Sequence, residues 1–151
     1  ETNDNFLDSV LPHEITHLIF RDFVGFKGEV PLWMDEGVAQ WEEDNKRAAA
    51  LQRMPSLVAG ADTFTIQTLT SMDIRKETDP EKVGLFYIQA ISLVDFLIKN
   101  FGASSFTNLC RELRDGKSLE AAIRSAYPYS IKDLEDLDDK WRRHVLKRSS
   151  Q

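Results

Sequence analysis

Apolar residues recur every three to four positions along most of the chain, a spacing that predicts a fold built mainly from helices. A first helix is expected over residues 9–23, where Asp8 or Ser9 supplies the N-cap. A second is expected over residues 31–53, starting at Pro31, because proline suits the first helical position. The stretch MPSLVAGAD then breaks the pattern.

The second half of the chain is also largely helical in pattern. The sequence TFTIQTLTSM, residues 63–72, suits either a short strand or a helix of one or two turns, because it is rich in β-branched residues. Residues 74–82 form a predicted polar surface loop. Helices are predicted over residues 83–100, 104–114, 118–127 and 130–148. The first of these four is apolar on more than one side and is the expected central, buried helix.

Length and composition point to one domain. A chain of 151 residues, 42% of them apolar, can form one ordinary globular core. The expected fold is therefore mainly α, with at most a small amount of β, in a single domain over residues 1–151. Because the chain begins with Glu rather than Met, we expect it to be a segment of a longer protein, with a possible upstream domain. Cys110 lies at helical spacing from Phe106 and Leu113 and is expected to be a core thiol.

Charge and hydropathy limit the kinds of binding partner that the sequence predicts. A net charge of −6 argues against a nucleic-acid surface, although the last helix is locally basic. The chain contains no run of about 18 apolar residues, so the sequence predicts no membrane span. The compartment stays open, because a targeting sequence could have been removed.

The first candidate metal ligands lie in the stretch LPHEITHLIF, Leu11 to Phe20. Two of the three histidines in the chain, His13 and His17, lie four residues apart. On an α-helix this spacing puts both side chains on one face, one turn apart, so both rings can bind one metal ion. A catalytic zinc takes three protein ligands and keeps a fourth position for water. Glu14 points too far around the helix to join the same tetrahedron, and it can reach the metal-bound water instead.

The third ligand is expected from PLWMDEGVAQW. Glu36 follows His17 after eighteen intervening residues and belongs to the second predicted helix. A helix, a loop and an antiparallel helix would bring its carboxylate beside the two imidazoles and complete a set of two histidines and one glutamate.

These residues resemble a known family. HEITH followed by the glutamate of WMDEG is similar to the gluzincin metallopeptidases, and the spacing resembles the aminopeptidase N branch. The later YIQA, Phe101 with Gly102, and Leu137 to Trp141 resemble the small peptidase MA-like families. The resemblance covers about residues 10–146. It implies a zincin-like helical catalytic core that binds Zn²⁺ and hydrolyses peptide or protein substrates.

The resemblance also implies roles for individual residues. Glu14 would be the general base that takes a proton from the zinc-bound water and passes it to the leaving amine. Tyr87 would donate a hydrogen bond to the oxyanion, although an aromatic residue among its apolar neighbours is more often core packing. Asp35 or Gln40 could accept a hydrogen bond from a ligating imidazole, but both are more often solvated helix residues. His144 is expected on the surface.

The sequence departs from the gluzincin pattern in two places. Only twelve residues precede His13, whereas gluzincins generally place a small β-sheet there whose edge strand pairs with substrate. The G-x-M-E-N stretch of the aminopeptidase branch is missing, so aminopeptidase activity is not predicted. Two alternatives to a metallopeptidase therefore stay open: a catalytically silent zinc-binding helical domain with a binding or regulatory role, and a metal-free helical interaction module.

Overall fold

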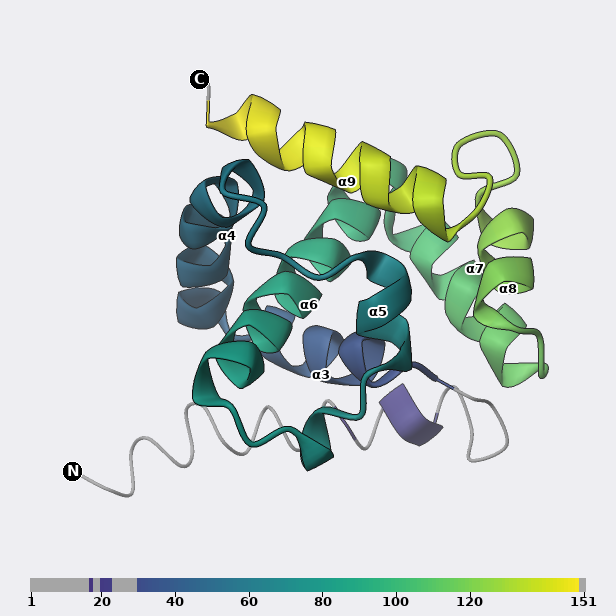
Figure 1. Ribbon diagram of the computed structural model, residues 1–151. Coiled ribbons are helices and arrows are strands. Elements are labelled where there is room, and N and C mark those ends of the chain that lie inside the picture. The colour runs from purple at the N-terminus through teal and green to yellow at the C-terminus, as the bar shows by residue number, and fades with distance from the viewer. Residues whose placement is uncertain (1–16, 18–19, 23–29, 150–151) are drawn as a thin grey trace.

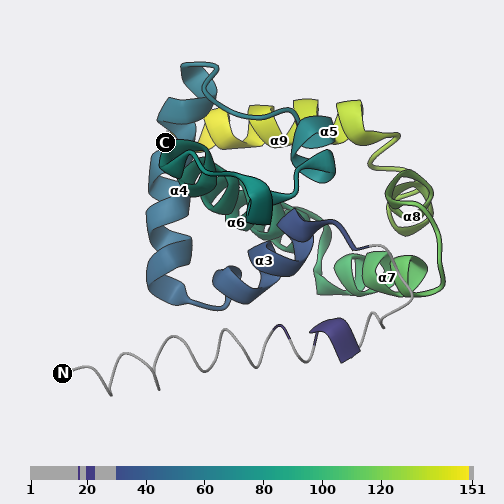
Figure 2. The same cartoon turned by 60° about the horizontal axis from the view of Figure 1, so that its bottom comes forward.

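Helix α6 (Pro80–Phe101) runs through the centre of the molecule, and α3, α4, α7 and α9 pack against it (Figures 1 and 2). The computed structural model describes residues 17, 20–22 and 30–149. Within these ranges the ordered elements are helices, with no strand, which confirms the predicted mainly α fold. The other elements are α3 (Leu32–Trp41), α4 (Asp44–Ala59), α5 (Ile66–Ser71), a 3₁₀ turn (Ile74–Lys76), α7 (Ala103–Arg114), α8 (Leu119–Ala126) and α9 (Leu134–Arg148).

The ends of α6 follow from its sequence. The side chain of Asp79 accepts a hydrogen bond from the backbone N–H of Glu81, and Pro80 occupies the first turn, where its missing N–H costs nothing. Gly102 ends the helix with a φ of 88°, a conformation that glycine adopts without strain. The expected central helix is therefore correct, but it begins at Pro80, inside the segment expected to be a loop. Ile74 in the same segment is buried.

The helix expected over residues 31–53 is two helices. The backbone turns at Glu42 and Glu43, where Glu43 is extended, and the guanidinium of Arg47 donates to the carbonyl of Trp41 at the end of α3. Residues 42–49 carry no large apolar side chain, so the periodicity could not locate this break. The prediction of one continuous helix was wrong.

The second of these helices, α4, continues past its expected end. It runs to Ala59 with Pro55 inside it, because Met54 and Val58 are buried in the core on either side of the proline. Pro55 removes one backbone hydrogen bond but does not end the helix.

Helix caps explain the structure at two further places, residues 63–72 and the start of the last helix. Residues 63–72 contain a short helix, α5, whose first turn is capped by the Thr65 hydroxyl, and not a strand. The last helix begins at Leu134 rather than near Ser130, because Asp133 caps it by accepting from the N–H of Asp136. Of the helix expected over residues 9–23, only positions 17 and 20–22 are described, and these are helical.

Helix α3 crosses α6 at very close range. Gly37 faces the crossing point, and a Cβ atom built there would lie 2.9 Å from the carbonyl oxygen of Ala90 and 2.9 Å from a methyl group of Val94. Contacts this short are not tolerated by real Cβ atoms. The glycine of the D-E-G triplet is thus what lets α3 approach α6, and it sets the position of Glu36, the residue before it.

Three tryptophans tie the helices together through their indole N–H groups. Trp33 donates to Thr70 (3.1 Å), Trp41 to Asp95 (2.9 Å) and Trp141 to Ser92 (3.0 Å). Trp33 and Trp141 are fully buried, so each combines a large apolar contact with a satisfied donor. Both ends of α3 are therefore fixed, by Trp33 to the end of α5 and by Trp41 to α6.

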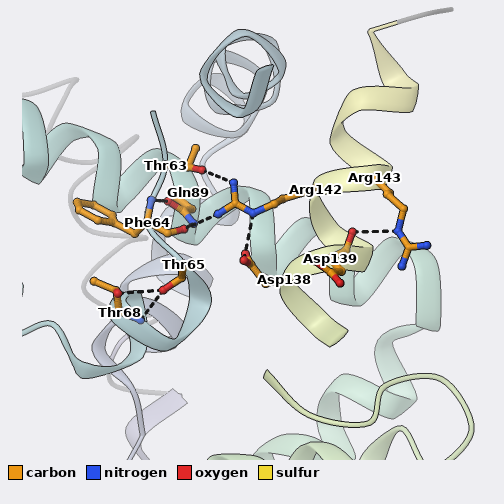
Figure 3. A network of polar contacts seen from close by, with 9 residues as sticks. All are labelled: Thr63, Phe64, Thr65, Thr68, Gln89, Asp138, Asp139, Arg142 and Arg143. Carbon is orange, nitrogen blue, oxygen red and sulfur yellow. Dashed lines mark hydrogen bonds and ion pairs between the residues drawn. The ribbon is translucent and has the colours of Figure 1, made fainter. Parts of the chain in front are cut away.

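A polar network holds the segment before α5. Gln89 on α6 bonds both backbone groups of Phe64, accepting from its N–H at 3.1 Å and donating to its carbonyl at 2.7 Å (Figure 3). Arg142 on α9 donates to the same carbonyl, to the Thr63 hydroxyl and to Asp138. Gln89 is fully buried, so this exchange satisfies an amide that would otherwise destabilise the core. The network joins α6, α9 and the start of α5.

The single cysteine lies in the core. Cys110 is buried and packs in the core, as expected from its spacing. Its burial raises the pKa of the thiol to about 12. Among the helices that the structure describes, none is both long and apolar enough to cross a membrane.

The close crossing predicts opposite effects for two glycine substitutions. Gly37→Ala should lower the free energy of unfolding by up to about 2 kcal/mol, because overpacking costs about 1–3 kcal/mol and better helix propensity returns about 1. Gly84→Ala is the control, since a Cβ there meets nothing within 4 Å and should stabilise α6 by about 0.5–1 kcal/mol. Urea denaturation of both variants measures the difference. Equal stabilisation by the two substitutions would show that the packing of α3 on α6 does not require a glycine at position 37.

Candidate metal centre

Two neighbouring residues of α3 contact the two nitrogens of one imidazole. The Nδ1 atom of His17 lies 2.9 Å from Oδ1 of Asp35, and the Nε2 atom lies 3.6 Å from Oε2 of Glu36. Adjacent helix residues point about 100° apart, so the two carboxylates approach the ring from different sides. The ring is buried, with 7% of its residue surface exposed.

The contact with Asp35 fixes the ring. A carboxylate accepts, so a hydrogen on Nδ1 completes the contact with Asp35; in the neutral ring the lone pair is then on Nε2, the nitrogen that faces Glu36. Asp35 is itself buried, with 6% exposed, so the expectation of a solvated helix residue was wrong. Asp35 thus contacts the ring nitrogen that a metal-bound histidine usually uses for such an acceptor, and the sequence left this position open to Asp35 or Gln40.

The pair of His17 and Glu36 suits a shared metal ion. Their separation of 3.6 Å is longer than an ordinary N–H···O hydrogen bond. Zinc bonds of about 2.0–2.1 Å in a tetrahedron separate two ligand atoms by roughly 3.3 Å, so a small approach would bring both atoms onto one ion. The Glu36 side chain keeps 21% of its surface exposed, which leaves this side open to solvent.

Tyr87 on α6 belongs to the same region. Burial raises the pKa of its hydroxyl, and the negative charge of Glu36 raises it further. The ring is half-buried and meets Phe86 edge-on, with ring centres 5.6 Å apart. The ring of Tyr87 therefore packs on the core, as one of the two expectations had it, and the charge of Glu36 acts on its hydroxyl; its role toward an oxyanion stays a prediction.

The remaining predicted site residues are not described. His13 and Glu14 lie outside the described residues, so their places in the site stay predictions. Across residues 17, 20–22 and 30–149, no group of three or more His, Cys, Asp and Glu side chains forms a metal site.

Sequence reasoning missed Arg21. Its guanidinium donates from Nε (3.3 Å) and Nη2 (3.0 Å) to Oδ2 of Asp35, the oxygen that His17 does not use. A signal was available, because Arg21 follows His17 by four residues and so shares its helix face.

The third histidine lies elsewhere. His144 on α9 packs its ring 5.0 Å from that of Phe96 and bonds the side chain of Asn100, so it is half-buried rather than on the surface. Burial and the nearby Arg148 lower its pKa.

Comparison with known proteins agrees with the helical core. The family model described as the Peptidase MA superfamily matches residues 4–147, which is nearly the whole chain. The chain belongs to the Peptidase MA superfamily. No curated protein and no solved structure matches it significantly. Members of this superfamily are generally zinc-dependent, and membership suggests a metallopeptidase-like domain with a protein substrate.

The electrostatic effect of Glu36 on the pKa of Tyr87 predicts a measurable coupling between the two residues. In metal-free protein, Glu36→Gln should lower the pKa of Tyr87, because a neutral side chain no longer opposes the phenolate; burial should still hold the pKa above its ordinary value. Titration followed by NMR of the tyrosine ring carbons measures the change. Glu81→Gln, at the exposed start of α6, is the control and should leave it unchanged. An unaltered pKa in Glu36→Gln would separate Tyr87 from the site.

Proposed function

We propose that the chain is a zinc-dependent metallopeptidase of the gluzincin type. His13, His17 and Glu36 would hold the zinc ion, Glu14 would be the general base, and Tyr87 would stabilise the oxyanion. The single observation that carries the proposal is the arrangement of His17 between Asp35 and Glu36.

The arrangement of His17, Asp35 and Glu36 fits a metal site. A buried histidine kept only for packing needs one hydrogen-bond partner, which Asp35 already provides through Nδ1. When the ring is neutral, the lone pair of Nε2 faces the Glu36 carboxylate at 3.6 Å, which is unfavourable unless a cation lies between the two atoms. A divalent cation between them removes this repulsion, so the donor set fits zinc.

The chain's own residues then have separate tasks. Zinc bound there would lower the pKa of a coordinated water toward about 7 and polarise the scissile carbonyl. Asp35 holds the ring of His17 in the tautomer that can ligate, and Gly37 lets α3 approach α6 so that Glu36 and Tyr87 share one region. Glu14 takes the proton of the attacking water and delivers it to the leaving amine, help worth about 10²–10⁴ in rate.

Tyr87 is suited to donate a hydrogen bond. Its pKa is raised by burial and by Glu36, so the hydroxyl keeps its proton at neutral and mildly alkaline pH. A neutral hydroxyl can donate to the oxygen of the tetrahedral intermediate, where negative charge develops.

The substrate proposed is a peptide or unstructured protein. Residues 1–151 form a single domain in this proposal, and a region upstream in a longer protein could complete the substrate groove.

The general base gives the first test of function. The wild-type chain should bind about one zinc per molecule and hydrolyse an unfolded protein such as casein, with activity lost in a chelator. Glu14→Gln should keep the zinc and lose about 10²–10⁴ in kcat, because the amide cannot accept a proton. Zinc content by elemental analysis and hydrolysis by a fluorescent peptide assay measure the two properties.

The control and the alternative follow from the same assay. Glu135→Gln, in the exposed first turn of α9, should change neither property. Full hydrolysis by Glu14→Gln would remove its assigned role. Stoichiometric zinc with no hydrolysis in the wild type would favour the catalytically silent zinc-binding domain, and no zinc at all would contradict both.

Tyr87 gives an independent test of transition-state stabilisation. Tyr87→Phe keeps the ring that packs on Phe86 and removes only the hydroxyl, so stability and zinc content should stay the same. Loss of one oxyanion donor should reduce kcat about 10²–10³-fold with little change in KM. Tyr129→Phe is the control, because Tyr129 is 99% exposed. Unchanged turnover in Tyr87→Phe would leave the residue a packing role alone.

A further inference from the structure

We infer that Arg21 is a positioning residue of the metal centre, which acts on His17 through Asp35. The inference rests on the proposed function, because it assigns to Arg21 a role in metal binding without contact with the metal.

The contacts divide the carboxylate of Asp35 between two donors. His17 bonds Oδ1 at 2.9 Å, whereas both guanidinium contacts of Arg21 go to Oδ2, at 3.0 and 3.3 Å. The terminal torsion of an aspartate is soft, so one hydrogen bond does not fix the plane of the carboxylate. A second donor on the other oxygen does, and it thereby keeps Oδ1 aimed at the ring.

Arg21 also balances a local excess of negative charge. Asp35 and Glu36 are consecutive, and both carboxylates lie within 4 Å of the same imidazole. Without a cation nearby, Asp35 would be repelled by Glu36 and drawn toward solvent. Arg21 reaches this buried oxygen from the surface, since 54% of its own side chain is exposed but only 8% of that of Asp35 is.

Arg21 has two opposite effects on metal affinity, so the direction of the change on its removal shows which effect is larger. As a positive charge near the site, Arg21 should repel a divalent cation, so its removal alone would tighten metal binding. As the residue that holds Asp35 and thus His17 in place, it should strengthen binding. Loss of a partner that orients a ligand typically costs 10–100-fold in metal affinity, whereas an exposed cation is strongly screened by water. The positioning effect should therefore win.

The experiment compares three variants of the full chain. Arg21→Met keeps much of the side-chain length and loses the charge and all donors; it should weaken zinc binding about tenfold in competition with a chromophoric chelator. Arg21→Lys keeps the charge and one donor group and should recover part of the loss. Arg143→Met, an exposed arginine on α9 that bonds the Asp139 carbonyl, is the matched control and should bind zinc like the wild type.

A second measurement needs no metal. In chelator-treated wild type at pH 8, nitrogen NMR of the His17 ring should show the hydrogen on Nδ1, and in Arg21→Met it should show both tautomers. A purely structural Arg21 would instead lower the unfolding temperature of the metal-free protein and leave the tautomer unchanged.

The outcomes separate the inference from the proposed function. Equal or tighter zinc binding by Arg21→Met, or an unchanged tautomer in that variant, would overturn the role of Arg21 and leave the metallopeptidase proposal standing. If the wild type binds no zinc, the proposed function fails and the positioning role at a metal centre fails with it. In that case the NMR comparison still decides whether Arg21 orders the ring of His17 through Asp35.

Discussion

The site depends on how closely α3 lies on α6. Only a residue without a side chain fits at position 37, because Ala90 and Val94 already occupy the space that a Cβ would need. This contact carries the neighbouring Glu36 to the side of α6 where Tyr87 lies, and the same helix carries Asp35 to His17. A packing constraint between two helices thus sets the distances on which the proposed chemistry depends.

The motif residues that resemble a peptidase signature divide into structural and chemical roles. In YIQA, Ala90 lies opposite Gly37 where α3 crosses α6, and Gln89 bonds the backbone before α5, so both residues build the core. Tyr87 keeps a polar group near Glu36. In WMDEG, Asp35 and Glu36 are consecutive carboxylates with unequal surroundings: Asp35 is buried against two donors, whereas Glu36 faces Nε2 of His17 and is partly exposed.

Sequence reasoning predicted the helical class and the buried central helix because α6 is apolar on several sides and has clear caps. It failed where no apolar side chain marks the backbone, as at the turn between Trp41 and Asp44, and where burial outweighs a helix breaker, as at Pro55. At the site, spacing linked His17 to Glu36, and the structure brings these two close. The burial of Asp35 and its bond to Arg21 depend on tertiary packing, which residue type and spacing do not report.

The indole bonds at the two ends of α3 have a consequence for the entropy of ligand binding. Trp33 and Trp41 flank Asp35 and Glu36 and anchor the helix to α5 and α6 before any ion arrives. A chelating group carried by such a restrained helix loses little conformational freedom on coordination, so more of the intrinsic bond strength is available as affinity. In the proposed metal site, α3 would therefore be the part that needs no further ordering when the ion binds.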